Sequence, residues 1–188
     1  MLTFFRIAFL ALKRVLTGEV VRRVDIEALG GLARISVRLK RSRSSGDQYV
    51  VLAGLASGGA QYLVFELDEF DRLIEAAKNI RASAQPRGAV PQAAPGWWKS
   101  ISLVLTGDVV QRIDTEVLGG YCTVSLRLKR PHASGMDYVV LAAIAKGNYH
   151  YFGFDMDQFD QFIGAVKNIR EAASSGAMGA LASPRTQT

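Results

Sequence analysis

The chain carries the same segment twice. VLTGEVVRRVDIEALGG, which begins at Val15, aligns without a gap with VLTGDVVQRIDTEVLGG, which begins 89 residues later at Val104. The alignment continues over residues 15–84 and 104–173, where about half of the positions are identical. A unit of about 70 residues has only a marginal hydrophobic core of its own. The duplication therefore predicts that the two units bury a shared face and pair within the chain as a pseudo-symmetric dimer.

Each unit shows four strand patterns followed by one helix pattern. In the first unit, residues 20–29 are rich in β-branched side chains and end at a glycine pair, which is typical of a strand and a turn. Residues 35–39 alternate apolar and polar side chains, and residues 49–56 and 61–67 are two further strands. A helix is expected from about Asp68, with cations near its end. The predicted fold class is α+β, with two antiparallel sheets that are each followed by a helix.

Three segments outside the two units differ from them in composition. Residues 1–14 form an apolar and basic arm, and residues 85–103 form a linker that ends in a lead-in with Trp97 and Trp98. We expect residues 174–188 to be a disordered tail. Apolar side chains recur at helical spacing in the arm, which favours a segment that covers the core over a helix that binds a membrane surface or a partner. The arm and the tryptophans are thus candidates for homo-oligomer or protein contacts.

The net charge of +6 and the pI near 9.7 would favour a polyanionic partner. The two units, however, are nearly neutral: residues 15–84 hold ten Lys or Arg and nine Asp or Glu, and residues 104–173 hold seven and eight. The surplus of positive charge lies in the arm, the linker and the tail. Any basic surface on the units must therefore be a local stripe.

The chain offers few groups for catalysis. It has one cysteine, Cys122, and two histidines, His132 and His150, and neither histidine recurs in the other unit. Two acidic residues recur near the start of each predicted helix, where helix capping explains them better than metal or acid–base chemistry. These residues are Asp68 and Asp71, and Asp157 and Asp160. We expect neither an enzyme nor a bound metal or cofactor.

The sequence favours a soluble protein of a reducing compartment. A single cysteine allows no disulfide within the chain, and no uncharged run reaches the roughly 18 residues of a membrane-spanning helix. The apolar start carries no evident cleavage site of a signal peptide. A cytoplasmic location is the resulting expectation.

A basic row follows the second strand of each unit. It comprises Arg34, Arg38, Lys40 and Arg41 in the first unit, and Arg127, Lys129 and Arg130 in the second. Such a row could contact phosphates, and Tyr62 and Tyr151 on neighbouring strands could stack on bases. The alternative is structural: the cations form cross-strand pairs with acidic neighbours, and the tyrosines pack within the sheets. The sequence leaves both interpretations open.

The junction between the fourth strand and the helix carries a resemblance to known proteins. YLVFELDEFDRLIEAAKNIR and YFGFDMDQFDQFIGAVKNIR, each ending a ββββα unit, resemble the group that includes the purine-rich-element-binding (PUR) repeats, the Whirly proteins and the positive-cofactor coactivators. The resemblance implies two units clasped together, whose curved sheets offer basic and aromatic faces to single-stranded DNA or RNA. The sequence hypothesis is a non-enzymatic protein that binds single strands. The alternative is a protein-interaction or self-assembly module with no nucleic-acid role.

Overall fold

The first unit forms an antiparallel sheet and one long helix. The computed structural model describes residues 13–28, 33–56, 59–84, 107–131, 137–145 and 148–181. Strands β1 (Glu19–Ala28), β2 (Ala33–Arg41), β3 (Gln48–Ala56) and β4 (Gly59–Phe65) pair in the order β1-β2-β3-β4. Helix α2 (Leu67–Ser83) follows. Its N-cap is Glu66, and Glu69 completes a capping box that satisfies backbone amides at the helix start.

The second unit repeats this order. Strands β5 (Asp108–Val117), β6 (Cys122–Arg130), β7 (Tyr138–Ala145) and β8 (Asn148–Phe154) pair consecutively, and helix α4 (Met156–Leu181) follows. The predicted α+β fold with two ββββα units is confirmed. The first strand of each unit, β1 and β5, has a register irregularity at an equivalent place, between Val20 and Arg22 and between Val109 and Gln111.

The second helix is longer than the sequence pattern suggested. We expected a disordered tail from residue 174, whereas α4 continues to Leu181. The added residues include two alanines, a methionine and a leucine, which are good helix formers, beside two glycines, which are poor ones. Of the other segments outside the units, residues 1–12 and 85–106 lie outside the described residues.

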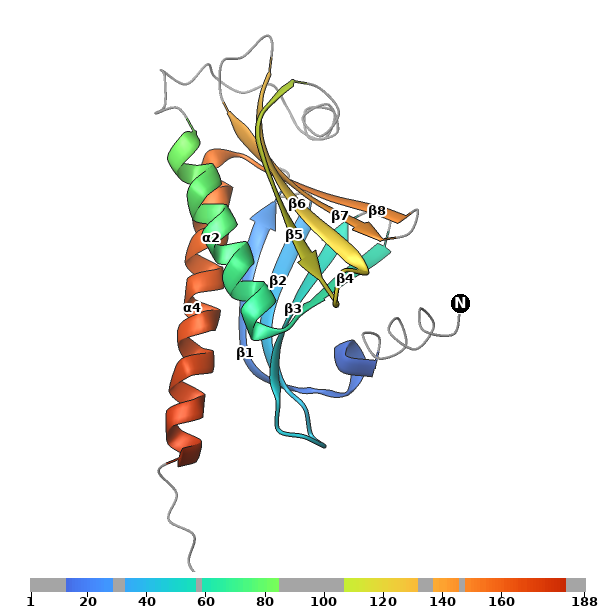
Figure 1. Ribbon diagram of the computed structural model, residues 1–188, viewed down its shortest axis with the longest axis vertical. Coiled ribbons are helices and arrows are strands. Elements are labelled where there is room, and N and C mark those ends of the chain that lie inside the picture. The colour runs from blue at the N-terminus through green and yellow to red at the C-terminus, as the bar shows by residue number, and fades with distance from the viewer. Residues whose placement is uncertain are drawn as a thin grey trace, which may run out of the picture.

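The helices are exchanged between the units. Helix α2 makes most of its strand contacts with β5 and β6 of the second unit, and α4 makes most of its own with β1 and β2 of the first. Figure 1 shows the two helices side by side along one side of the molecule, with the two sheets next to them. The apolar faces of both sheets and both helices join in one buried cluster. The shared core agrees with the pseudo-dimer predicted from the duplication.

Two equivalent ion pairs join the exchanged helices. Arg81 donates from Nε and Nη2 to Asp160 at 2.6 and 3.1 Å, and Arg170 donates to Asp71 at 2.6 and 3.0 Å. The second pair is the first shifted by the 89-residue repeat, with the units reversed, as a two-fold axis requires. The sequence analysis assigned Asp71 and Asp160 to helix capping, and this assignment is wrong. The capping group of α2 is the Glu66–Glu69 box, and the two aspartates form ion pairs between α2 and α4.

Within the described residues, no helix is both long enough and apolar enough to span a membrane.

Candidate nucleic-acid interface

The face of each sheet that points away from the core is the outer face. On β2, Ala33, Ile35, Val37 and Leu39 join the core, so the residues between them lie on the outer face. The register places Arg23 of β1 opposite Arg38 of β2, and Asp25 opposite Ser36. The second sheet has the same arrangement, with Arg112 opposite Arg127 and Asp114 opposite Ser125. Each outer face therefore carries two adjacent arginines from neighbouring strands.

A hydrogen-bonded network holds each pair of arginines. Arg23 donates from Nε to Asp25 at 2.9 Å, and Arg38 donates from Nε to Ser36 Oγ at 2.9 Å. The hydrogen bond from Arg23, with a further one from Ser36, holds the pKa of Asp25 below its usual value despite partial burial. The side chains of Arg23 and Asp25 are 48% and 36% exposed, whereas Ser36 is buried and Arg38 is half-buried. The β1 side of the network is therefore the part that lies at the solvent surface.

The second unit reproduces this network. Arg112 donates to Asp114 at 2.9 Å, and Arg127 donates to Ser125 at 3.1 Å. The pKa of Asp114 is lowered for the same reasons, with Arg112 as the main cause. A repeated network could serve stability alone. It also fixes the guanidinium group of both arginines in each pair through a hydrogen bond from Nε.

The arginine pairs retain capacity for an anion. Two like charges directly opposite each other on neighbouring strands destabilise a sheet unless a counter-charge compensates them. Asp25 supplies one negative charge against Arg23 and Arg38. Among the described residues, neither arginine donates a hydrogen bond from its terminal Nη groups. A phosphate, which accepts several hydrogen bonds and favours guanidinium forks, matches these donors.

The two lysines of the predicted basic row are not on the surface. Lys40 is 4% exposed and donates from Nζ to the carbonyl oxygens of Arg14 and Val15, at 3.3 and 2.5 Å. Burial, with a smaller contribution from Arg38, lowers its pKa. Lys129 is 7% exposed, and its Nζ lies 5.8 Å from the ring centroid of Tyr138. Lys40 thus anchors the helical residues 13–17 to the first sheet and does not offer its ammonium to a ligand at the surface.

The remaining cations of the row have different surroundings. Arg34 is exposed on the outer face of β2, opposite Glu27 of β1. Arg41 and Arg130 lie at the ends of β2 and β6 and are half-buried. Arg130 forms a double hydrogen bond with the buried carboxylate of Asp137, at 2.8 and 3.1 Å. Of these three arginines, Arg34 is the one that is exposed on the same outer face as Arg23 and Arg38.

Tyr62 and Tyr151 are exposed at equivalent edges of the two sheets. They are 44% and 38% exposed, on β4 and β8. The register continues the row of Asp25 and Ser36 through Ala53 to Tyr62. Since neighbouring strands lie about 4.8 Å apart, Tyr62 lies roughly 10 Å from the β2 row along the sheet. Each outer face therefore has arginines on its first two strands and an exposed aromatic ring on its fourth, while the outward residues of the third strand that lie between them are buried.

Sequence reasoning missed Arg23 and Arg112. It considered the second strand of each unit and did not ask which first-strand residues lie opposite. A signal was available, because the second arginine of VVRRVD aligns with the arginine of VVQRID while the first aligns with Gln111. Their position on the outer face also depends on the irregularity in β1 and β5, which changes which side chains share a face.

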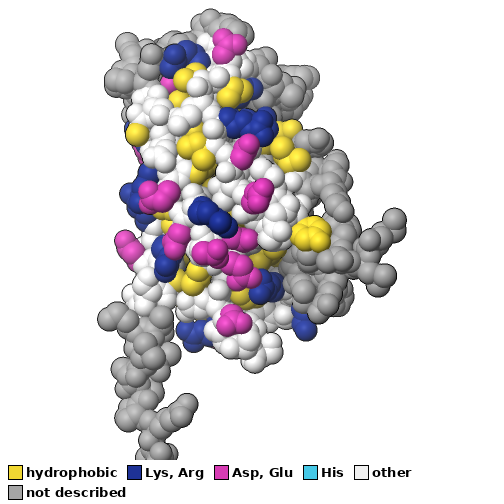
Figure 2. Space-filling view, viewed as in Figure 1, with side chains coloured by type: hydrophobic (Ala, Val, Ile, Leu, Met, Phe, Trp, Pro, Cys, Tyr) yellow, Lys and Arg dark blue, Asp and Glu magenta, His cyan; other side chains and the backbone are white. Residues whose placement is uncertain are grey.

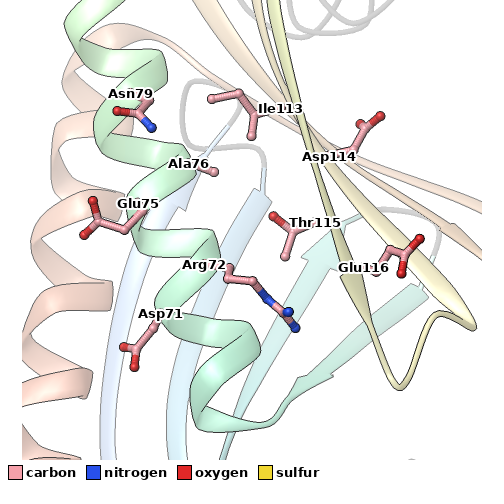
Figure 3. Close-up of a pocket in the computed structure, with 9 residues that line it drawn as sticks. All are labelled: Asp71, Arg72, Glu75, Ala76, Asn79, Ile113, Asp114, Thr115 and Glu116. Atoms are coloured by element: carbon pink, nitrogen blue, oxygen red, sulfur yellow. The ribbon is translucent and has the colours of Figure 1, made fainter.

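A groove lies between α2 and β5. It has a volume of about 560 Å³, and Figure 3 shows Arg72 extending toward it from α2. Three of its four acidic side chains form ion pairs: Asp71 with Arg170, Glu75 with Lys78, and Asp114 with Arg112. The fourth, Glu116, lies opposite the neutral Thr123. On this side of the molecule, acidic and basic side chains interleave (Figure 2). No cluster of metal-binding side chains occurs in the part of the chain that the structure describes.

Comparison with known proteins gives similarity of structure only. No family model and no curated protein matches the sequence. Among solved structures, the chain is similar to WHY1 from Arabidopsis thaliana, with 13% identity, a TM-score of 0.40, and coverage of 81% of this chain and 91% of that one. It is also similar to the plant transcriptional regulator PBF-2, with 12% identity, a TM-score of 0.41, and coverage of 89% and 91%. For WHY3 from Arabidopsis thaliana, the identity is 12%, the TM-score is 0.35, and coverage is 88% and 96%. These are Whirly proteins, one of the groups that the sequence resembles.

Proposed function

We propose that this protein binds single-stranded DNA or RNA on the outer faces of its two sheets, without catalysing a reaction. The observation that supports the proposal is the repetition of one surface. An arginine pair held by an aspartate and a serine, with an exposed tyrosine on the fourth strand, occurs at equivalent positions in both units. Packing alone requires neither surface arginines directly opposite each other nor exposed rings.

The proposed roles follow from the chemistry of the side chains. Arg23 and Arg38 in the first unit, and Arg112 and Arg127 in the second, contact phosphates through their terminal Nη groups. Arg34 adds a third cation to the first face. Tyr62 and Tyr151 stack on bases, which is possible only where the faces of the bases are accessible, as in a single strand. Of the other residues in the predicted row, Lys40, Lys129, Arg41 and Arg130 support the sheets in this proposal.

The test is fluorescence anisotropy of labelled single-stranded DNA, single-stranded RNA and duplex DNA, titrated at several salt concentrations. We expect single strands to bind more tightly than duplex, with an affinity that falls as salt rises. Replacing Arg38 and Arg127 with glutamine should reduce the slope of the salt dependence by about 0.7 for each phosphate that the variant no longer binds. Replacing Tyr62 and Tyr151 with alanine should cost about 1–3 kcal/mol for each base that stacks.

A matched control is Arg72→Gln. The Arg72 side chain is 59% exposed and lies on α2, away from both outer faces. Its loss removes the same charge and should leave the salt slope unchanged. Equal effects of the Arg72 and Arg38 variants would mean that only net charge matters, and would refute the assigned surface. Failure of every single strand to bind at low salt would refute the function itself.

A second candidate function is self-assembly, and one observation favours it. Val20, Val21, Val109 and Val110 are 43–51% exposed and occupy equivalent places at the starts of β1 and β5. Exposed valines on an edge strand can pair with another copy of the chain, although an irregular edge opposes such pairing. Residues 1–14 and the two tryptophans, the candidates from sequence, lie mostly or entirely outside the described residues. Sedimentation velocity of the wild-type chain and of the Val20→Lys, Val109→Lys variant tests this candidate. A larger species that the variant loses, in a chain that binds no single strand, supports assembly alone; the same loss with unchanged single-strand binding supports both functions.

A cytoplasmic location belongs to the same proposal, and cell fractionation with antibody detection tests it.

A further inference from the structure

We infer that one chain has two separate single-strand sites on opposite sides of the molecule, so that it can hold two strand segments at once. The inference rests on the proposed function and adds the number and placement of its sites. It also ranks them: the first unit has the tighter site.

The placement of the sites follows from the shared core. Leu39, Leu52 and Phe65 of the first sheet and Leu128, Leu141 and Phe154 of the second all belong to one buried cluster. The two sheets meet closely, because a Cβ atom at Gly54 would lie only 2.1 Å from the ring of Phe152 in the other unit. Since the inner faces of the sheets are turned toward each other, their outer faces are turned apart. A short strand that binds one face cannot reach the other.

Each unit supplies all the residues of its own site, which supports two separate sites and not one site shared between the units. Every element of the first network, from Arg23 to Ser36, is supplied by β1 and β2 of the same unit, and Tyr62 by β4. The second site draws likewise on β5, β6 and β8. Among the residues that the structure describes, no side chain of either network comes from the other unit. Each face can therefore bind its own strand independently.

The ranking follows from one difference between the repeats. Arg34 of β2 lies opposite Glu27, and its equivalent Thr123 of β6 lies opposite Glu116. In the first site the glutamate has a cation beside it, whereas in the second the glutamate faces a neutral side chain. The first site thus has one more cation for the same number of acids. An exposed ion pair of this kind changes affinity by about two- to fivefold.

Two sites on one rigid body would change what the protein does to nucleic acid. A strand held on one face raises the local concentration of any second segment that the other face binds. The protein would then connect two segments, either of one long molecule or of two molecules. A protein with a single continuous site would coat one strand instead.

The experiment is isothermal titration of the full chain with a single-stranded oligonucleotide of about six nucleotides, which is too short to contact both faces. We expect two bound oligonucleotides per chain, with affinities that differ by about two- to fivefold. The variant Arg23→Gln, Arg38→Gln should lose the tighter site and keep the weaker one. The variant Arg112→Gln, Arg127→Gln should do the reverse. The two variants remove the same groups from equivalent places, so each is the control for the other.

A second assay tests the connection between segments. Two oligonucleotides, one with a donor fluorophore and one with an acceptor, should show energy transfer on the wild-type chain, and either double variant should abolish it. Binding of one oligonucleotide per chain, lost in both double variants, would overturn the inference and leave the proposed function standing. Absence of any oligonucleotide binding by the wild-type chain would overturn both. Circular dichroism of the variants checks that each remains folded.

Discussion

Gly54→Ala should destabilise the protein through a contact between the two units. Gly54 lies on β3 and faces Phe152 of β8. An added Cβ would lie 2.1 Å from Cε1 and 2.3 Å from Cζ of the Phe152 ring. A real Cβ does not approach so closely, so the buried ring or the strand must move. Overpacking of this kind costs about 1–3 kcal/mol. For a chain of this length, the melting temperature should fall by about 2–4 °C for each kcal/mol.

The repeat itself suggests how to reverse the effect. The residues equivalent to Gly54 and Phe152 are Ala143 and Leu63. Of these two residue pairs across the units, one combines glycine with the larger ring and the other combines alanine with leucine. Phe152→Leu should therefore relieve the clash in the Gly54→Ala background. The double variant should be more stable than the sum of the two single changes predicts, by roughly 0.5–3 kcal/mol.

Urea denaturation followed by circular dichroism gives the four free energies of this cycle. Gly164→Ala is the control, because a Cβ at this position on α4 meets no atom within 4 Å. The same substitution there should stabilise the helix by about 0.5–1 kcal/mol. If Gly54→Ala is neutral, or if its effect is independent of Phe152→Leu, the close contact between the sheets is refuted. The pairing of the units within the chain would then need another explanation.

Three further predictions concern the carboxylates. Asp25→Asn removes one negative charge that we place ~6 Å from a bound phosphate, and the repulsion between the two is worth roughly 0.7 kcal/mol in water. The affinity for single strands should therefore rise about threefold. A loss of affinity in anisotropy titrations would show instead that Asp25 mainly positions Arg23. The pKa values of Asp25 and Asp114 are lowered in the folded chain, so their contribution to stability is present above the unfolded pKa of about 3.9 and is lost as the pH falls through the lower folded values. Urea midpoints measured from pH 5 down to pH 2 should therefore fall less in the Asp25→Asn, Asp114→Asn variant, and parallel profiles would contradict this. In the Asp71–Arg170 ion pair, the aspartate side chain is more than a third exposed. A double-mutant cycle should therefore give a coupling free energy of only about 0.2–1 kcal/mol. A value near zero would mean that packing alone holds the helices together.

The sequence alone determined the duplication, the order of the elements and the inner face of β2. These features are local or periodic. An alternation such as Ile35, Val37 and Leu39 places three side chains on one face of a strand wherever that strand lies in the fold. The helix was found for the same reason, because its apolar spacing, acidic start and basic end are encoded within 17 residues.

The exchange of the helices was decided by tertiary structure. The pattern of α2 shows that one face is apolar, but both sheets offer an apolar face to cover. Packing α2 against β5 and α4 against β1 buries both helices in a single core, and only that arrangement brings Arg81 to Asp160 and Arg170 to Asp71. Sequence spacing placed these aspartates near helix starts, where capping was the nearest explanation. Their partners lie 79 and 99 residues away in the chain.

The composition of the candidate site was also decided by tertiary contacts. Alternation places Arg38 and Lys40 on the same face of β2 and cannot distinguish them. Residues 13–17 pack beside Lys40 and accept its hydrogen bonds, whereas Arg38 is only half-buried and remains in contact with solvent. Strand pairing across β1 then supplies Arg23 as its neighbour. A sequence specifies which side chains share a face, whereas the distances and burial that turn them into a binding surface arise only when distant segments pack together.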